Sequence, residues 1–100
     1  MILAKEYKEL ILKEEFFNAH EVLEEFWFPR RKNKTRKVLI VKGFINAAVA
    51  FELKKRGRRE QALKVWQTYK KFSRLIKSNE TLFIELKEFI EDYAKMYLFK

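Results

Sequence analysis

A nearly continuous apolar stretch at residues 38–53 constrains the fold more than any other feature of the sequence. Only four of its sixteen residues are not apolar: Lys42, Gly43, Asn46 and Glu52. A helix that is apolar nearly all round has to be surrounded by other elements, and Gly43 lets a neighbouring backbone come close despite its cost in helix propensity. Gly57 is typical of the left-handed cap that ends a helix. The sequence therefore predicts a central hydrophobic helix over about 38–55.

The spacing of apolar residues on both sides of this stretch predicts four more helices. Apolar residues recur every three or four positions over about 3–12, 15–28, 59–77 and 82–97, with Asn79 or Thr81 as the expected cap of the last. Pro29 ends the second helix, and the segment 29–37, with six basic residues in nine and no apolar anchor, is expected to be a loop. We predict an all-α bundle of about five helices in a single domain over residues 1–100.

The residue types that are rare in the chain exclude several classes of site. There is no Cys and one His, which excludes disulfides, thiolate nucleophiles, cysteine zinc sites and any metal site that needs two imidazoles from one chain. No apolar run reaches the roughly 20 residues that span a bilayer, and the N-terminus does not resemble a signal peptide. We expect a cytoplasmic protein with no metal, no cofactor and no membrane contact; a homo-oligomer stays open.

One polar constellation, His20-Glu21-Val22-Leu23-Glu24-Glu25-Phe26-Trp27, stands out on the second predicted helix. At 100° per residue, Glu24 and Trp27 lie within about 40° of His20 on the apolar face, whereas Glu25 faces solvent. A polar pair on a buried face needs hydrogen-bond partners. The central helix offers Lys42 and Asn46, which lie one turn apart. The expected cluster consists of His20, Glu21, Glu24, Trp27, Lys42, Gly43 and Asn46.

The same residues carry a resemblance to a known family. Residues 17–27, residues 43–50 and the Arg56-Gly57 pair resemble the helical family called domain of unknown function 309, and the likeness covers roughly residues 10–65. The resemblance implies a small helical bundle, with a His-Glu-x-x-Glu-x-x-Trp motif on one helix and a Gly-containing core helix packed against it. It implies no settled biochemical activity. The family favours Gln where this chain has Lys42 and Asn46, and Asn where it has Arg58.

Three interpretations of the motif follow from its chemistry. We favour a structural network in which His20 and Glu24 fix how two helices pack, because buried polar groups are usually hydrogen-bonded structure. A His beside carboxylates can also serve a ligand or catalytic pocket, with Trp27 as one wall. A metal site is the least favoured, because the motif lacks the second His of the zinc-protease sequence. A cavity beside His20 would favour the pocket, and a packed cluster would favour an interaction or scaffold module without enzymatic activity.

Charge is concentrated in the middle of the chain, although the net charge is only +9. Residues 29–77 hold 17 Lys and Arg against two Glu, which makes nonspecific binding of a nucleic acid or another anionic polymer a further alternative. The residues expected to contact it are Arg30, Arg31, Lys32, Lys34, Arg36 and Lys37. A second basic cluster, at 54–59, lies about 27 Å away along the central helix. A continuous surface would need residues of the fourth helix to bridge the two: Lys64, Lys70, Lys71 and Arg74.

Overall fold

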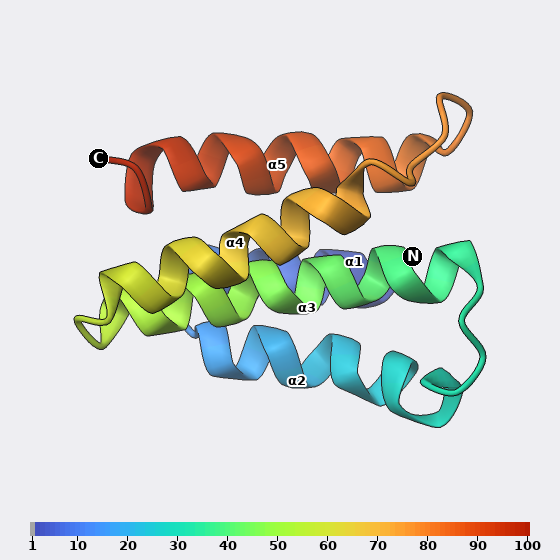
Figure 1. The fold of residues 1–100 in the computed structure, drawn as a ribbon, viewed down its shortest axis with the longest axis horizontal. Coiled ribbons are helices and arrows are strands. Elements are labelled where there is room, and N and C mark those ends of the chain that lie inside the picture. The colour runs from blue at the N-terminus through green and yellow to red at the C-terminus, as the bar shows by residue number, and fades with distance from the viewer. Residues whose placement is uncertain (1) are drawn as a thin grey trace.

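Five α-helices form most of the computed structural model, which describes residues 2–100 (Figure 1). The helices, together with one short 3-10 helix η1 after the second, are α1 (Ile2–Leu12), α2 (Phe16–Trp27), η1 (Phe28–Arg30), α3 (Arg36–Lys55), α4 (Arg59–Ser73) and α5 (Thr81–Tyr97). No strand occurs in the part of the chain that the structure describes. The predicted all-α bundle is confirmed. None of the helices in this part is long and apolar enough to cross a membrane.

Helix α3 is the central helix, as predicted. In Figure 1 it lies between α4 and α2, with α1 behind it, and half of its residues are buried. It begins at Arg36, inside the segment 29–37 that was expected to be a loop, because the Thr35 hydroxyl oxygen accepts a hydrogen bond from the backbone N–H of Val38 and so caps the first turn. At its other end Gly57 has a φ of 81°, the left-handed conformation predicted for it.

Gly43 belongs to the contact between α3 and α4. A Cβ atom added to Gly43 would lie 3.0 Å from the Cβ atom of Phe72 and 3.5 Å from the carbonyl oxygen of Tyr69, so only Gly allows the two backbones to approach this closely. The close approach predicted at Gly43 is therefore present. The sequence analysis grouped Gly43 with the His20 cluster, and this grouping is wrong because its nearest neighbours lie on α4.

Helix α5 packs against the others through large aromatic rings. Its ribbon stands apart from the other helices in Figure 1 because ring pairs fill the space between them. The ring of Tyr93 lies 5.1 Å from that of Phe51 and 6.1 Å from that of Phe16, and the Phe83 ring lies 6.4 Å from that of Phe44. Aromatic pairs at such distances add attraction to the burial of their area. The distance between α5 and the other helices thus follows from the size of the side chains between them.

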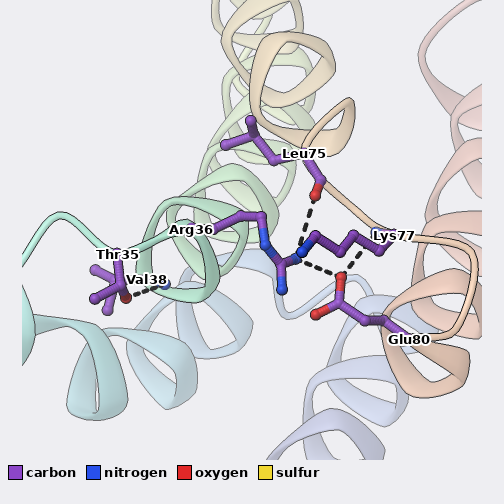
Figure 2. A network of polar contacts seen from close by, with 6 residues as sticks. All are labelled: Thr35, Arg36, Val38, Leu75, Lys77 and Glu80. Carbon is purple, nitrogen blue, oxygen red and sulfur yellow. Dashed lines mark hydrogen bonds and ion pairs between the residues drawn. The ribbon is translucent and has the colours of Figure 1, made fainter.

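The connection between α4 and α5 differs from the prediction at both ends. Helix α4 ends at Ser73 and not near residue 77. The N-cap residue of α5 is Glu80, and not Asn79 or Thr81 as predicted. The Glu80 carboxylate instead accepts hydrogen bonds from the backbone N–H of Lys77, at 2.8 Å, and from the guanidinium of Arg36 (Figure 2). Arg36 also donates to the carbonyl oxygen of Leu75 at 3.2 Å. This network ties the connection to the start of α3.

Replacing Glu80 with Gln should lower the melting temperature at neutral pH. The hydrogen bond from Arg36, followed by the one from the backbone of Lys77, lowers the pKa of Glu80 from 4.5 to about 2. A carboxyl group with a lowered pKa stabilises the fold above its unfolded-state pKa, and this contribution is lost as the pH falls toward the folded-state value. Thermal melts should therefore show a difference in melting temperature between wild type and Glu80→Gln. This difference should be largest at pH 7 and should vanish near pH 2.

The matched control is Glu85→Gln, on an exposed residue of α5 for which no ion pair is found within residues 2–100. It should leave the melting temperature unchanged at pH 7. A difference between wild type and Glu80→Gln that stays constant from pH 7 to pH 2 would show that the Glu80 charge does not stabilise the fold.

Candidate functional site

The His20 and Glu24 side chains pair on α2 but are not buried. The Nε2 atom of His20 lies 3.3 Å from the Oε2 atom of Glu24, and the two side chains are 25% and 30% exposed. The prediction of a buried pair is wrong because α2 is rotated: its buried residues are Phe16, Ala19 and Leu23, whereas Phe17 is 53% exposed. A partly exposed ion pair one turn apart on a helix contributes only about 0.3–0.5 kcal/mol.

Of the predicted partners on α3, one reaches the motif. The Lys42 ammonium lies 4.6 Å from the centroid of the half-buried Trp27 ring, which is the geometry of a cation–π contact. The Asn46 amide donates instead to the carbonyl oxygen of Lys42 on its own helix, at 2.9 Å. Glu21 is exposed. The structure thus brings together one pair between α2 and α3, Trp27 with Lys42, and one pair within α2, His20 with Glu24.

The two nitrogens of the His20 imidazole differ in their surroundings. Its Nε2 atom faces Glu24, and its Nδ1 atom is buried without a hydrogen-bond partner among the described residues. The ring also lies 5.7 Å from the ring of Phe17. A general base must reach its substrate within hydrogen-bond distance. The Nε2 atom already has a carboxylate partner, whereas the Nδ1 atom has none and is shielded from solvent.

A small cavity opens beside His20, between α2 and α3. Its volume is about 230 Å³, and Phe17, Val49 and Leu53 supply much of its wall. Two polar residues at the cavity, Glu52 and Arg56, already form an ion pair at 2.6 Å. Ligand pockets usually measure about 300–1,000 Å³ and offer polar groups to the ligand. The cavity keeps the pocket interpretation open without providing a polar anchor.

No metal-binding cluster surrounds the motif. Among residues 2–100 as described, no three His, Asp or Glu side chains lie together in a way that could hold a metal ion. His20 and Glu24 alone supply two ligands, fewer than the three or four protein ligands of zinc sites.

Three of the six basic residues predicted to contact an anionic polymer are engaged within the fold. The Arg30 guanidinium donates to the carbonyl oxygen of Phe26 at 2.8 Å, and the Arg31 guanidinium donates to that of Phe28 at 2.6 Å. Each also lies over the ring of the residue to which it donates, at 4.2 and 3.8 Å. Arg36 bonds Glu80. Of the six, Arg36 alone pairs with an acidic side chain among the described residues, so the segment 29–37 presents one available cation fewer than its sequence suggests.

The four residues expected to bridge the two basic clusters are all exposed along α4 and just after its last residue. Helix α4 directs its buried residues, Trp66 among them, toward α3, and four exposed cations lie on its outer side within an arc of about 120°. We call this surface the α4 basic face; it consists of Lys64, Lys70, Lys71 and Arg74. Within residues 2–100, none of the four forms an ion pair. Arg58 and Arg59 are exposed at the start of α4, where the exposed carboxylate of Glu60 adds a negative charge.

The orientation of α4 determines where the α4 basic face lies. Helix α4 turns back at Gly57 and runs along α3 in the opposite direction (Figure 1), so that it extends from the basic end of α3 toward the Arg36 end. Its 15 residues cover about 22 Å. The sequence feature that indicates this face is an excess of positive charge. Residues 53–79 contain ten Lys and Arg and a single acidic residue, Glu60.

Comparison with known proteins identifies the family. The family model described as Domain of unknown function (DUF309) matches residues 4–65, which contain α1, α2, α3 and the first part of α4 and include the His20, Glu24 and Trp27 motif. No curated protein and no solved structure matches the chain. Most of the α4 basic face lies beyond the matched residues. Since the match covers more than half of the chain, the protein belongs to the DUF309 family, whose function is not established.

Proposed function

We propose that this protein is a non-enzymatic interaction module that binds the phosphate backbone of a nucleic acid through the α4 basic face. The observation that carries the proposal is the set of four exposed cations along α4 and at the residue that follows it, none of which has an acidic partner within residues 2–100. Unpaired Lys and Arg on a surface release counterions when they neutralise phosphates, and this release is the main source of nonspecific affinity.

The shape and composition of the face favour contact with a backbone over recognition of a base sequence. Helix α4 presents a convex surface, and Lys side chains act as point charges toward phosphate oxygens. Gln67 is a neutral polar side chain exposed near the middle of the face, whereas reading of base edges usually relies on several Arg, Asn or Gln side chains. Binding should therefore depend little on sequence.

The motif on α2 supports a role without catalysis. The Nε2 atom of His20 pairs with Glu24, its Nδ1 atom is buried, and the cavity beside it has an ion pair on its wall. The Trp27 and Lys42 contact joins α2 to α3. We infer that the motif helps to hold the bundle together, while the negatively charged nucleic acid binds to the positively charged α4 basic face.

A charge-matched pair of variants tests the proposal. The first replaces Lys64, Lys70, Lys71 and Arg74 with Gln, and the second replaces Arg30, Arg31, Lys32 and Lys34 with Gln. Both remove four positive charges, so they have the same net charge and differ only in where the charge is lost. We expect the first variant to bind a 20-base-pair duplex about 100-fold more weakly than wild type at 50 mM salt, because each lost phosphate contact removes nearly one released counterion.

The second variant should lose less than about tenfold, because its four residues lie outside the α4 basic face and contribute only through the long-range attraction that every surface cation supplies. Circular dichroism should show both variants to be folded. Equal losses in the two variants would show that net charge, and not the α4 basic face, determines binding. Failure of wild type to bind the duplex at 50 mM salt would also contradict the proposal.

A further inference from the structure

A second cavity opens at the other end of the bundle, where α3 and α5 begin. Its volume is about 440 Å³, within the range of about 300–1,000 Å³ that is usual for small-molecule sites. Four helices contribute to its wall, which is largely apolar, through side chains that include Phe26, Val41, Phe83 and Leu86. It is larger than the cavity beside His20, which measures about 230 Å³, and is large enough to hold the body of an organic ligand.

Polar residues gather on one part of this cavity. Lys37, Asn79 and Thr81 line it together with Glu80, and all but Glu80 are exposed. The Glu80 carboxylate is already engaged by Arg36 and by the backbone of Lys77 (Figure 2). Lys37 forms no ion pair within residues 2–100.

The charges at this polar part come from two residues of the cavity wall and one neighbour. Lys37 and Glu80 line the cavity with opposite charges, and Arg36, beside Glu80, adds a second positive charge. Because Arg36 bonds Glu80 directly, Lys37 is the cation left for a ligand. The amide of Asn79 and the hydroxyl of Thr81 add hydrogen-bond donors that suit an anionic oxygen. An apolar enclosure with one available cation at its edge fits a molecule with an apolar body and one anionic head.

We propose that this cavity binds a free, linear carboxylate amphiphile of the medium-chain fatty-acid type. The apolar chain lies against Phe26, Val41, Phe83 and Leu86, and the carboxylate bonds the Lys37 ammonium. This assigns Lys37 a role other than the polymer contact predicted for it from the sequence. The site is separate from the α4 basic face, so it stands whether or not the protein binds nucleic acid.

Decanoate, used below its micelle concentration, is the probe for this site. We expect it to bind wild type with one saturable site by isothermal titration calorimetry, and to shift the amide NMR signals around Val41 and Phe83 more than those around Val49 and Leu53 of the other cavity. Decanol, which has the same chain and no charge, should bind at least about tenfold more weakly, because charge-assisted hydrogen bonds are among the strongest.

Two exposed residues at the cavity allow substitutions that leave the fold intact, each with a matched control. Lys37→Gln removes the available cation, and Leu82→Gln makes an exposed part of the wall polar. Each should weaken decanoate binding about five- to tenfold. Lys32→Gln removes an exposed cation outside the cavity, and Met96→Gln makes a different exposed apolar residue polar; neither should change the affinity.

Three results would overturn the proposal. One is the absence of saturable decanoate binding to wild type. Another is equal weakening by Lys37→Gln and Lys32→Gln, which would show that decanoate responds only to net charge. The third is decanol binding as tightly as decanoate, which would show that the site does not recognise an anionic head.

Discussion

Phe51→Ala should lower the free energy of unfolding by about 3–5 kcal/mol, the usual cost of deleting a fully buried Phe side chain. Phe51 is on α3 and has no exposed surface. Its ring lies 5.5 Å from that of Phe16 on α2, 5.9 Å from that of Trp66 on α4 and 5.1 Å from that of Tyr93 on α5. One substitution thus leaves a cavity where four helices meet, in a fold whose total stability is expected to be about 5–15 kcal/mol.

Equilibrium denaturation in urea measures this loss. The matched control is Phe28→Ala, which makes the same chemical change at a largely exposed residue of η1. It removes the contact between the Phe28 ring and the Arg31 guanidinium, which is worth about 1 kcal/mol or less at an exposed site. If the two variants lose the same stability, the ring cluster around Phe51 is not the core of the bundle.

The central helix could be predicted from the sequence because its evidence is local. The apolar stretch, the cations near its end and Gly57 all lie within a few turns of one another. A helix that is apolar on every side has no rotation to be determined, so the prediction did not depend on knowing its neighbours.

The rotation of α2 could not be predicted in the same way. The pattern of large apolar side chains placed Phe17 on the inner face together with His20. In the structure Ala19 is buried and Phe17 is exposed. A small residue such as Ala19 adds little to a hydrophobic pattern, but it allows a neighbouring helix to approach closely. Where two helices approach closely depends on the surfaces of both, which the sequence of α2 alone does not give. This is why His20 and Glu24 were expected to be buried and are in fact at the edge of the contact.

The end of α4 was mispredicted for a related reason. Leu75 and Ile76 continue the apolar spacing of the helix, so the sequence alone favours a longer helix. The residues that fix the connection are far apart in the chain: the Arg36 and Glu80 pair spans 44 positions. Such pairs are tertiary contacts, which override local helix preference. The same contact removes Arg36 from the cations available to a polymer.

The α4 basic face could be predicted from the sequence only in part. Its four residues were identified from the sequence only as the bridge that a continuous surface would need. Whether the bridge existed depended on α4 turning back along α3, which the short turn at Gly57 makes possible. The sequence therefore indicated which residues could form the face, and the packing of α4 leaves these four side chains exposed.

The affinity of wild type for duplex DNA should fall about 10³-fold between 50 and 200 mM salt. This value assumes six phosphate contacts, made by the four residues of the α4 basic face together with Arg58 and Arg59, and a dependence of nearly one released counterion for each contact. A plot of the logarithm of the association constant against the logarithm of the salt concentration should then have a slope of about −5. Fluorescence anisotropy of a labelled duplex over this salt range gives the slope directly.

The variant that lacks the four cations of the α4 basic face should give a slope about 3–4 units shallower than wild type, because each lost contact removes close to one unit. A duplex of scrambled sequence and equal length should bind wild type within a few fold of the original, since contacts to phosphates carry no base information. Binding that persists at 200 mM salt, or a strong preference for one of the two duplexes, would mean that side chains contact base edges. Because α4 presents mostly Lys and Arg side chains and a single neutral amide near its middle, such a result would place the binding surface elsewhere on the molecule.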